Sequence, residues 1–115
     1  MAFSPDGRRL ATGSDGAVNV WDWRKRQLLH KLPGHGNLGI NIAFSPDGRR
    51  LVSGSWTGDI MIWDAETGER LRTLSEHRQP VSALAFSPDG RLLVSASHDG
   101  TAKVWDLTSL DKKLK

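Results

Sequence analysis

The sequence contains no cysteine, and it has no apolar stretch long enough to cross a lipid bilayer. The first absence excludes disulfides, thiol catalysis and cysteine-ligated metals, and it is compatible with a cytoplasmic protein. The opening stretch MAFSPDGRRL lacks the apolar core of a secretion signal. We therefore expect no signal peptide and no membrane partner, and we expect a cytoplasmic location.

The composition is that of a folded protein of about one domain. The chain has 115 residues, of which 25% are charged and 37% hydrophobic. Its formal net charge is +3, which is mildly basic. A dedicated nucleic-acid-binding protein usually carries a stronger positive field, so nucleic acid is not the first partner that we expect.

An internal repeat dominates the sequence. One nonapeptide occurs three times with a single change: AFSPDGRRL at 2–10 and 43–51, and AFSPDGRLL at 85–93. The dipeptide Trp-Asp recurs every 42 residues: at 21–22, 63–64 and 105–106. Residues 43–64 and 85–106 are identical at 14 of 22 positions, which indicates duplication. A period of about 20 to 50 residues is typical of solenoids and propellers.

Each unit has the pattern of short strands joined by tight turns. In FSPDG, proline presets φ, aspartate suits the next position, and glycine takes the left-handed one. A strand of small residues follows, and then a strand that ends in tryptophan. Apolar residues stand one and three positions before each tryptophan: Val18 and Val20, Ile60 and Ile62, Ala102 and Val104. Because the tryptophan points the other way, we expect both faces of each sheet to be covered.

Four short strands per unit, the period and the Trp-Asp ending resemble the WD-repeat family of β-propellers. The resemblance covers essentially the whole chain. It implies an all-β fold of antiparallel four-stranded blades, about two and three-quarter of them, open or closed by oligomerisation. The implied bounds are about 1–33, 34–75 and 76–115 for the three blades. The implied function is a non-catalytic protein–protein interaction scaffold without a cofactor.

The family's blades carry a structural hydrogen-bond tetrad of His, Ser or Thr, Asp and Trp. Carried over by the resemblance, its members are His77, Ser95, Asp99 and Trp105 in the third unit, His35, Ser53 and Trp63 in the second, and Thr12, Asp15 and Trp21 in the first. Thr57 takes the place of the aspartate in the second unit, and the first unit has no upstream histidine. A Ser/His/Asp set also suits a hydrolase, but nothing in the sequence supplies an oxyanion hole or an exposed nucleophile. We therefore expect no enzyme.

Two other patterns predict no ligand. The histidines lack metal-ligand spacing, and we expect His30 and His98 to face solvent. The stretch GHGNLG at 34–39 matches G-x-G-x-x-G, but a strand rather than a helix follows it. Without the helix N-terminus there is no dipole to hold a pyrophosphate, so we predict neither a cofactor nor a metal.

Partner contacts in the family lie early in the first strand of a blade and just before the tetrad aspartate. Carried over by the resemblance, these positions are Leu38, Ile40 and Trp56 in the second unit, and Pro80, Ser82 and His98 in the third. Trp56 is the most informative, because tryptophan is a favoured anchor of protein interfaces. Packing of Trp56 on a neighbouring loop is the alternative, and the sequence does not decide between the two.

The first unit also has a local excess of basic side chains: Arg8, Arg9, Arg24, Lys25 and Arg26. This patch suggests a second function, a nucleic-acid-associated module, although a solvated charged rim is the simpler interpretation.

The sequence contains fewer than three blades, whereas a closed propeller needs about four to eight. The outward faces of the first and last blades therefore have no neighbouring blade in the sequence. We expect the face toward a missing fourth blade to carry Leu93 and Val104, and we expect the chain to associate with itself or to be a piece of a longer propeller.

Overall fold

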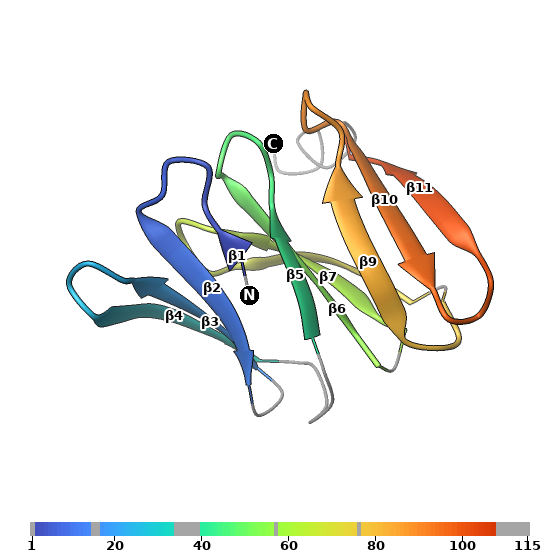
Figure 1. The fold of residues 1–115 in the computed structure, drawn as a ribbon, viewed down its shortest axis with the longest axis horizontal. Coiled ribbons are helices and arrows are strands. Elements are labelled where there is room, and N and C mark those ends of the chain that lie inside the picture. The colour runs from blue at the N-terminus through green and yellow to red at the C-terminus, as the bar shows by residue number, and fades with distance from the viewer. Residues whose placement is uncertain (1, 15–16, 34–39, 57, 76, 108–115) are drawn as a thin grey trace.

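The computed structural model describes residues 2–14, 17–33, 40–56, 58–75 and 77–107. In these ranges the chain forms eleven β-strands in three antiparallel sheets, which stand next to one another in chain order (Figure 1). None of the described residues forms a helix with the length and hydrophobicity to cross a membrane. The prediction of an all-β fold built from antiparallel blades is confirmed.

Each sheet is one blade, and its strands follow one another in sequence. Blade 1 contains β1 (Ala2–Phe3), β2 (Arg9–Ser14), β3 (Ala17–Asp22) and β4 (Gln27–Pro33). Blade 2 contains β5 (Ile40–Phe44), β6 (Arg50–Ser55), β7 (Ile60–Asp64) and β8 (Arg70–Leu74). Blade 3 contains β9 (Val81–Phe86), β10 (Leu92–Ser97) and β11 (Ala102–Asp106). The outer strands β4 and β8 complete the four strands that the resemblance implies for blades 1 and 2.

The Ser-Pro-Asp-Gly stretches form the turns between the first and second strands of the blades. In blade 1 the Ser4 hydroxyl donates to Asp6 Oδ1 at 2.6 Å, and the backbone N–H of Arg9 donates to Ser4 Oγ at 3.0 Å. Gly7 closes the turn with a φ of 72°, the left-handed conformation that favours glycine. The repeated motif is therefore the sequence of a self-bonded hairpin turn.

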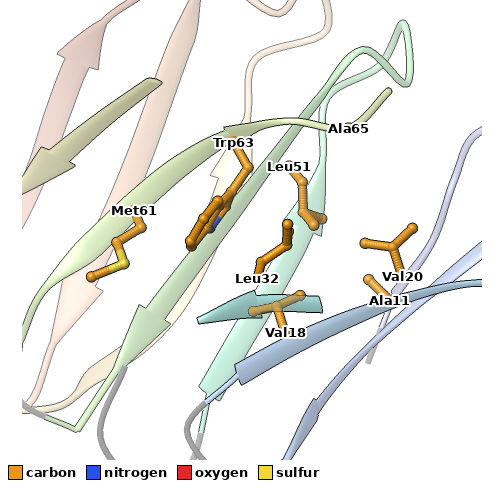
Figure 2. Packing of buried hydrophobic residues seen from close by; sticks show 8 residues of the cluster. All are labelled: Ala11, Val18, Val20, Leu32, Leu51, Met61, Trp63 and Ala65. Atoms are coloured by element: carbon orange, nitrogen blue, oxygen red, sulfur yellow. The ribbon is translucent and has the colours of Figure 1, made fainter. Parts of the chain in front are cut away.

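The first hydrophobic cluster lies between blades 1 and 2. Blade 1 contributes Ala11, Val18, Val20 and Leu32, and blade 2 contributes Leu51, Met61, Trp63 and Ala65. Figure 2 shows these side chains between the two ribbons, with the Trp63 indole toward blade 1. Burial of such apolar side chains stabilises the fold by about 1.5–3 kcal/mol for each large residue, so the packing of one blade on the next stabilises the protein.

The second cluster lies between blades 2 and 3. It contains Val52, Ile60 and Ile62 from the opposite face of blade 2, and Val81, Leu93 and Leu107 from blade 3. Blade 2 is thus covered on both faces, as the sequence predicts.

Within the described residues, blade 3 is covered on one face, which corrects one prediction. In the pairing of β10 with β11, Leu93 stands opposite Trp105 and Val94 stands opposite Val104. Opposite residues share a face, so Leu93 points with Trp105 toward blade 2 and is buried. Val104 lies on the open side, where it is 64% exposed. The prediction placed Leu93 on that open side and was wrong, because Leu93 and Val104 are out of phase in the two-residue period of the strands.

Candidate protein-interaction surface

The side chains of the third-unit tetrad lie within hydrogen-bond distance of one another. The buried His77 places Nε2 2.7 Å from Ser95 Oγ and Nδ1 3.2 Å from Asp99 Oδ2. Trp105 Nε1 donates to the same Ser95 oxygen at 3.1 Å. A neutral His77 with its proton on Nδ1 satisfies every link, since Ser95 then donates to Nε2 and Nδ1 donates to Asp99. This series of hydrogen bonds joins the loop before β9 to β10 and β11.

Asp99 is the polar centre of this loop region. The Thr101 hydroxyl and backbone N–H donate to its Oδ1, and the backbone N–H of Arg78 donates to Oδ2 at 3.2 Å. These hydrogen bonds, that of Thr101 Oγ1 first among them, hold the pKa of Asp99 well below its ordinary value. The carboxylate therefore stays ionised and keeps the turn after β10 tied to the segment before β9.

Blades 1 and 2 share one link of this arrangement with blade 3. Trp63 Nε1 donates to Ser53 Oγ at 2.9 Å, and Trp21 Nε1 donates to Thr12 Oγ1 at 3.0 Å. His35, Thr57 and Asp15 lie outside the described residues. The remaining tetrad links of these two blades stay predictions.

The residues chosen as partner contacts lie where blades 2 and 3 present turns and strand starts. The starts of β5 and β9 and the ends of β6 and β10 lie along the lower edge of Figure 1. Trp56, in the turn after β6, is 56% exposed. His98 is exposed in the turn after β10, and its backbone N–H donates to the carbonyl of the half-buried Pro80 at 3.0 Å.

Three further partner positions complete this set. Ser82 is exposed near the start of β9, and its hydroxyl donates to the Ala96 carbonyl at 3.3 Å. Ile40 begins β5 opposite Ser55, and Leu38 lies outside the described residues. The structure thus brings Pro80 and His98 together, and it leaves the indole of Trp56 accessible.

The Ser-Pro-Asp-Gly turns line the other edge of the molecule, where acidic and basic side chains alternate. Hydroxyl donation from the preceding serine, aided by a backbone N–H, lowers the pKa of each turn aspartate: Asp6, Asp47 and Asp89. One polar hollow between neighbouring turns is lined by Arg8, Arg9 and Arg49 together with Asp6, Asp47 and Glu66. Arg8 and Arg9 therefore lie among carboxylates, whereas a second hollow of the first unit is lined by Arg8, Arg24 and Lys25 with one acid, Asp22.

The sequence did not predict two contacts between blades 1 and 2. Arg9 Nη1 donates to the Ala65 carbonyl at 2.9 Å, and His30 Nε2 lies 2.8 Å from the Glu66 carbonyl. His30 is half-buried, so the expectation that it faces solvent was wrong. Strand alternation contained the signal, because His30 pairs with the buried Val20 in the β3–β4 ladder.

Comparisons with known proteins agree with this geometry. The family model described as "WD domain, G-beta repeat" matches residues 1–22, 26–64 and 68–106. The U5 small nuclear ribonucleoprotein 40 kDa protein of Homo sapiens is 54% identical over 35 residues, which are 30% of this chain and 10% of that protein. The WD repeat-containing protein VIP3 of Arabidopsis thaliana is 53% identical over 36 residues, 30% of this chain and 11% of that protein.

A solved structure is similar over nearly the whole chain. The crystal structure of RRP9 WD40 repeats matches with a TM-score of 0.86 and 32% sequence identity, and the match covers 94% of this chain and 34% of that one. The chain thus spans about a tenth of the length of the curated relatives and about a third of the solved structure.

Proposed function

Because the chain belongs to the WD40 repeat family, we propose that it is a non-catalytic scaffold that binds a protein or peptide segment at the Trp56 edge of blades 2 and 3. The exposed indole of Trp56, on a turn whose backbone is fixed, is the observation that carries this proposal. WD40 repeats in general act as protein-interaction scaffolds, and the match with RRP9 supports the same architecture here.

The backbone around Trp56 is held in place from two sides. Ser55 donates to the Asp59 carbonyl at 3.1 Å, and Gly58 donates to the Ser55 carbonyl at 3.1 Å. Gly58 has a φ of 91°, and a Cβ added there would overlap the carbonyl oxygen of His77. The turn that carries Trp56 is thus packed against the segment that carries the blade 3 tetrad. An anchor on such a turn loses little conformational freedom when it binds.

The chemistry around Trp56 defines the partner. The indole offers a large apolar surface, and the exposed Ser82 and His98 lie in the neighbouring blade. We propose a partner segment that places an apolar side chain on the indole and hydrogen-bonding groups toward blade 3. The nucleic-acid alternative is not favoured, because Arg8 and Arg9 share a hollow with Asp6, Asp47 and Glu66. Arg9 in addition donates to the Ala65 carbonyl.

The proposal also includes association of the chain with itself. Val104 in blade 3 is 64% exposed and Phe3 in blade 1 is 56% exposed, although both lie on sheet faces of the kind that the neighbouring blades bury. Apolar sheet faces left open drive association.

Selection of peptides from a random library against the 115-residue chain tests the Trp56 site. We expect Trp56→Ala to weaken the selected peptides about 30-fold, the loss of a hot-spot anchor worth about 2 kcal/mol. Leu28→Ala changes an exposed apolar residue in the outer strand of blade 1, and it is expected to leave peptide affinity unchanged.

Circular dichroism of both variants checks the fold. Selected peptides that bind Trp56→Ala and the original chain equally well would refute the proposed site. Binding of RNA or DNA that falls steeply with salt would instead favour the nucleic-acid alternative, whereas peptide binding that is insensitive to salt favours the scaffold.

A further inference from the structure

The interface between blades 1 and 2 joins two fixed positions of the repeat. Arg9 is the residue that follows Ser-Pro-Asp-Gly-Arg, and its guanidinium donates to the carbonyl of Ala65, the residue after Trp-Asp in the next blade. Between blades 2 and 3, the equivalent residues Arg50 and Leu107 line one hollow. We call the first position the reaching position and the second the receiving position. In both interfaces the reaching residue of one blade lies near the receiving residue of the next.

Both open faces carry an exceptional residue at these positions. In blade 3 the reaching position holds Leu92 instead of arginine, and it is 39% exposed. In blade 1 the receiving position holds Trp23, where the other blades have the buried Ala65 and Leu107, and Trp23 is 42% exposed. The open face of blade 3 thus has leucine in place of arginine at the reaching position. The open face of blade 1 has an aromatic residue at the receiving position.

We propose that a second copy of this chain docks head-to-tail, with the open face of blade 3 on the open face of blade 1 and Leu92 against Trp23. The inference rests on the self-association part of the proposed function and specifies its interface. The two internal interfaces set the register, because each places a reaching residue beside the receiving residue of the following blade. A head-to-tail contact of this kind closes into a ring if its rotation allows.

The conformation of Trp23 suits an apolar neighbour. Its Nε1 donates to the Gly7 carbonyl at 2.6 Å, so the polar atom of the indole is satisfied within blade 1. The Phe3 ring stands edge-on to the indole, with centroids 6.2 Å apart and planes at 82°. The Arg24 guanidinium lies over the indole, 5.4 Å from its centroid. Contact with Leu92 therefore leaves no hydrogen-bond donor of Trp23 unpaired, and it adds an apolar neighbour beside the Phe3 ring.

The rest of the two faces has counterparts inside the chain. On the blade 3 side, Val94 and Val104 stand at the repeat positions of Val52 and Ile62, which are fully buried between blades 2 and 3. On the blade 1 side, an apolar hollow is lined by Leu10, Thr12, Trp21, Trp23 and Arg26. Docking of a second copy would cover side chains whose equivalents are already covered within the chain.

Sedimentation of Leu92→Ala tests the contact. The substitution removes the apolar side chain from the indole and adds no charge for the neighbouring Arg24 to pair with, so we expect the dissociation constant of the self-associated form to rise about tenfold. Trp56→Ala makes the same kind of change on an exposed apolar residue outside both open faces, and it is expected to leave association unchanged. Circular dichroism confirms that both variants are folded.

Thiol cross-linking gives a second test, which the absence of native cysteine makes specific. Trp23→Cys and Leu92→Cys proteins are mixed and treated with a short bis-maleimide, and we expect a cross-linked heterodimer. The control mixture of Trp56→Cys with Leu92→Cys is expected to stay uncross-linked.

Association that is insensitive to Leu92→Ala, or equal cross-linking in both mixtures, would overturn the proposed interface and leave self-association standing. A monomer at all accessible concentrations would overturn both. Neither result bears on peptide binding at Trp56, which is measured separately.

Discussion

Blades 2 and 3 share 14 of 22 residues over 43–64 and 85–106, but their surroundings contrast. Val52 and Ile62 of blade 2 are fully buried, whereas Val94 and Val104 at the same repeat positions are exposed. In blade 3 the buried His77 links Ser95 to Asp99. The repeat thus encodes the blade itself, while the neighbouring blade decides how much of its apolar surface stabilises the fold. Blade 2 is stabilised by burial of apolar side chains on both of its faces. Blade 3 is stabilised by burial on one face and by the hydrogen bonds among His77, Ser95 and Asp99.

The largest effect is expected from truncating a side chain that differs in burial between the two blades. Ile62→Ala should destabilise the protein by about 2–5 kcal/mol, because it opens a cavity between blades 2 and 3. Val104→Ala should change stability by less than about 0.5 kcal/mol, because its side chain is exposed. Urea denaturation at low protein concentration measures both. Similar losses for the two variants would mean that the face of blade 3 is covered in solution.

A smaller effect is expected from breaking the hydrogen bonds among His77, Ser95 and Asp99 in blade 3. His77→Ala removes the link between Ser95 and Asp99 and should cost about 1–3 kcal/mol, the penalty for leaving buried partners unsatisfied. Amide hydrogen exchange should rise more in β9–β11 than in β5–β8. His98→Ala, at an exposed position in the same blade, serves as the control. If amide exchange rises equally in the two blades, the His77 hydrogen bonds do not stabilise blade 3 in particular.

The smallest effect is expected from lowering the pH, which weakens blade 3 through protonation of Asp99. The pKa of Asp99 lies lower in the folded protein than its unfolded value of about 3.9, so the ionised carboxylate stabilises the fold above that pH. This contribution is lost as the pH falls, starting near about pH 5. Asp99→Asn should therefore flatten the acid side of a plot of urea midpoint against pH. Glu66→Gln is the matched control, and an unchanged slope in Asp99→Asn would contradict the pKa assignment.

The sequence predicted the blade architecture because the repeat contains local rules. The Ser-Pro-Asp-Gly turn forms its own hydrogen bonds, and the two-residue alternation before each tryptophan sets the faces of the sheet. The link between tryptophan and serine or threonine, which the resemblance to the WD-repeat family implied, occurs in all three blades.

Two errors arose from strand phase within one blade. Leu93 was assigned to the wrong face although it pairs with Trp105, and His30 was expected to face solvent although it pairs with the buried Val20. The Arg9–Ala65 contact has no local signal, since an arginine after a turn is equally compatible with a solvated rim. Contacts between repeats depend on how the sheets pack, and a single sequence without aligned relatives does not specify that packing.

The order of strands within each sheet has a consequence for the kinetics of folding. Along the described chain, neighbours in every sheet are also neighbours in sequence, from β1-β2-β3-β4 to β9-β10-β11. Hairpins of this kind close short loops, which costs little chain entropy, so each blade can form early from local contacts. Docking of one preformed blade on the next then becomes the slower, rate-setting event, and the molecule folds as a row of coupled units.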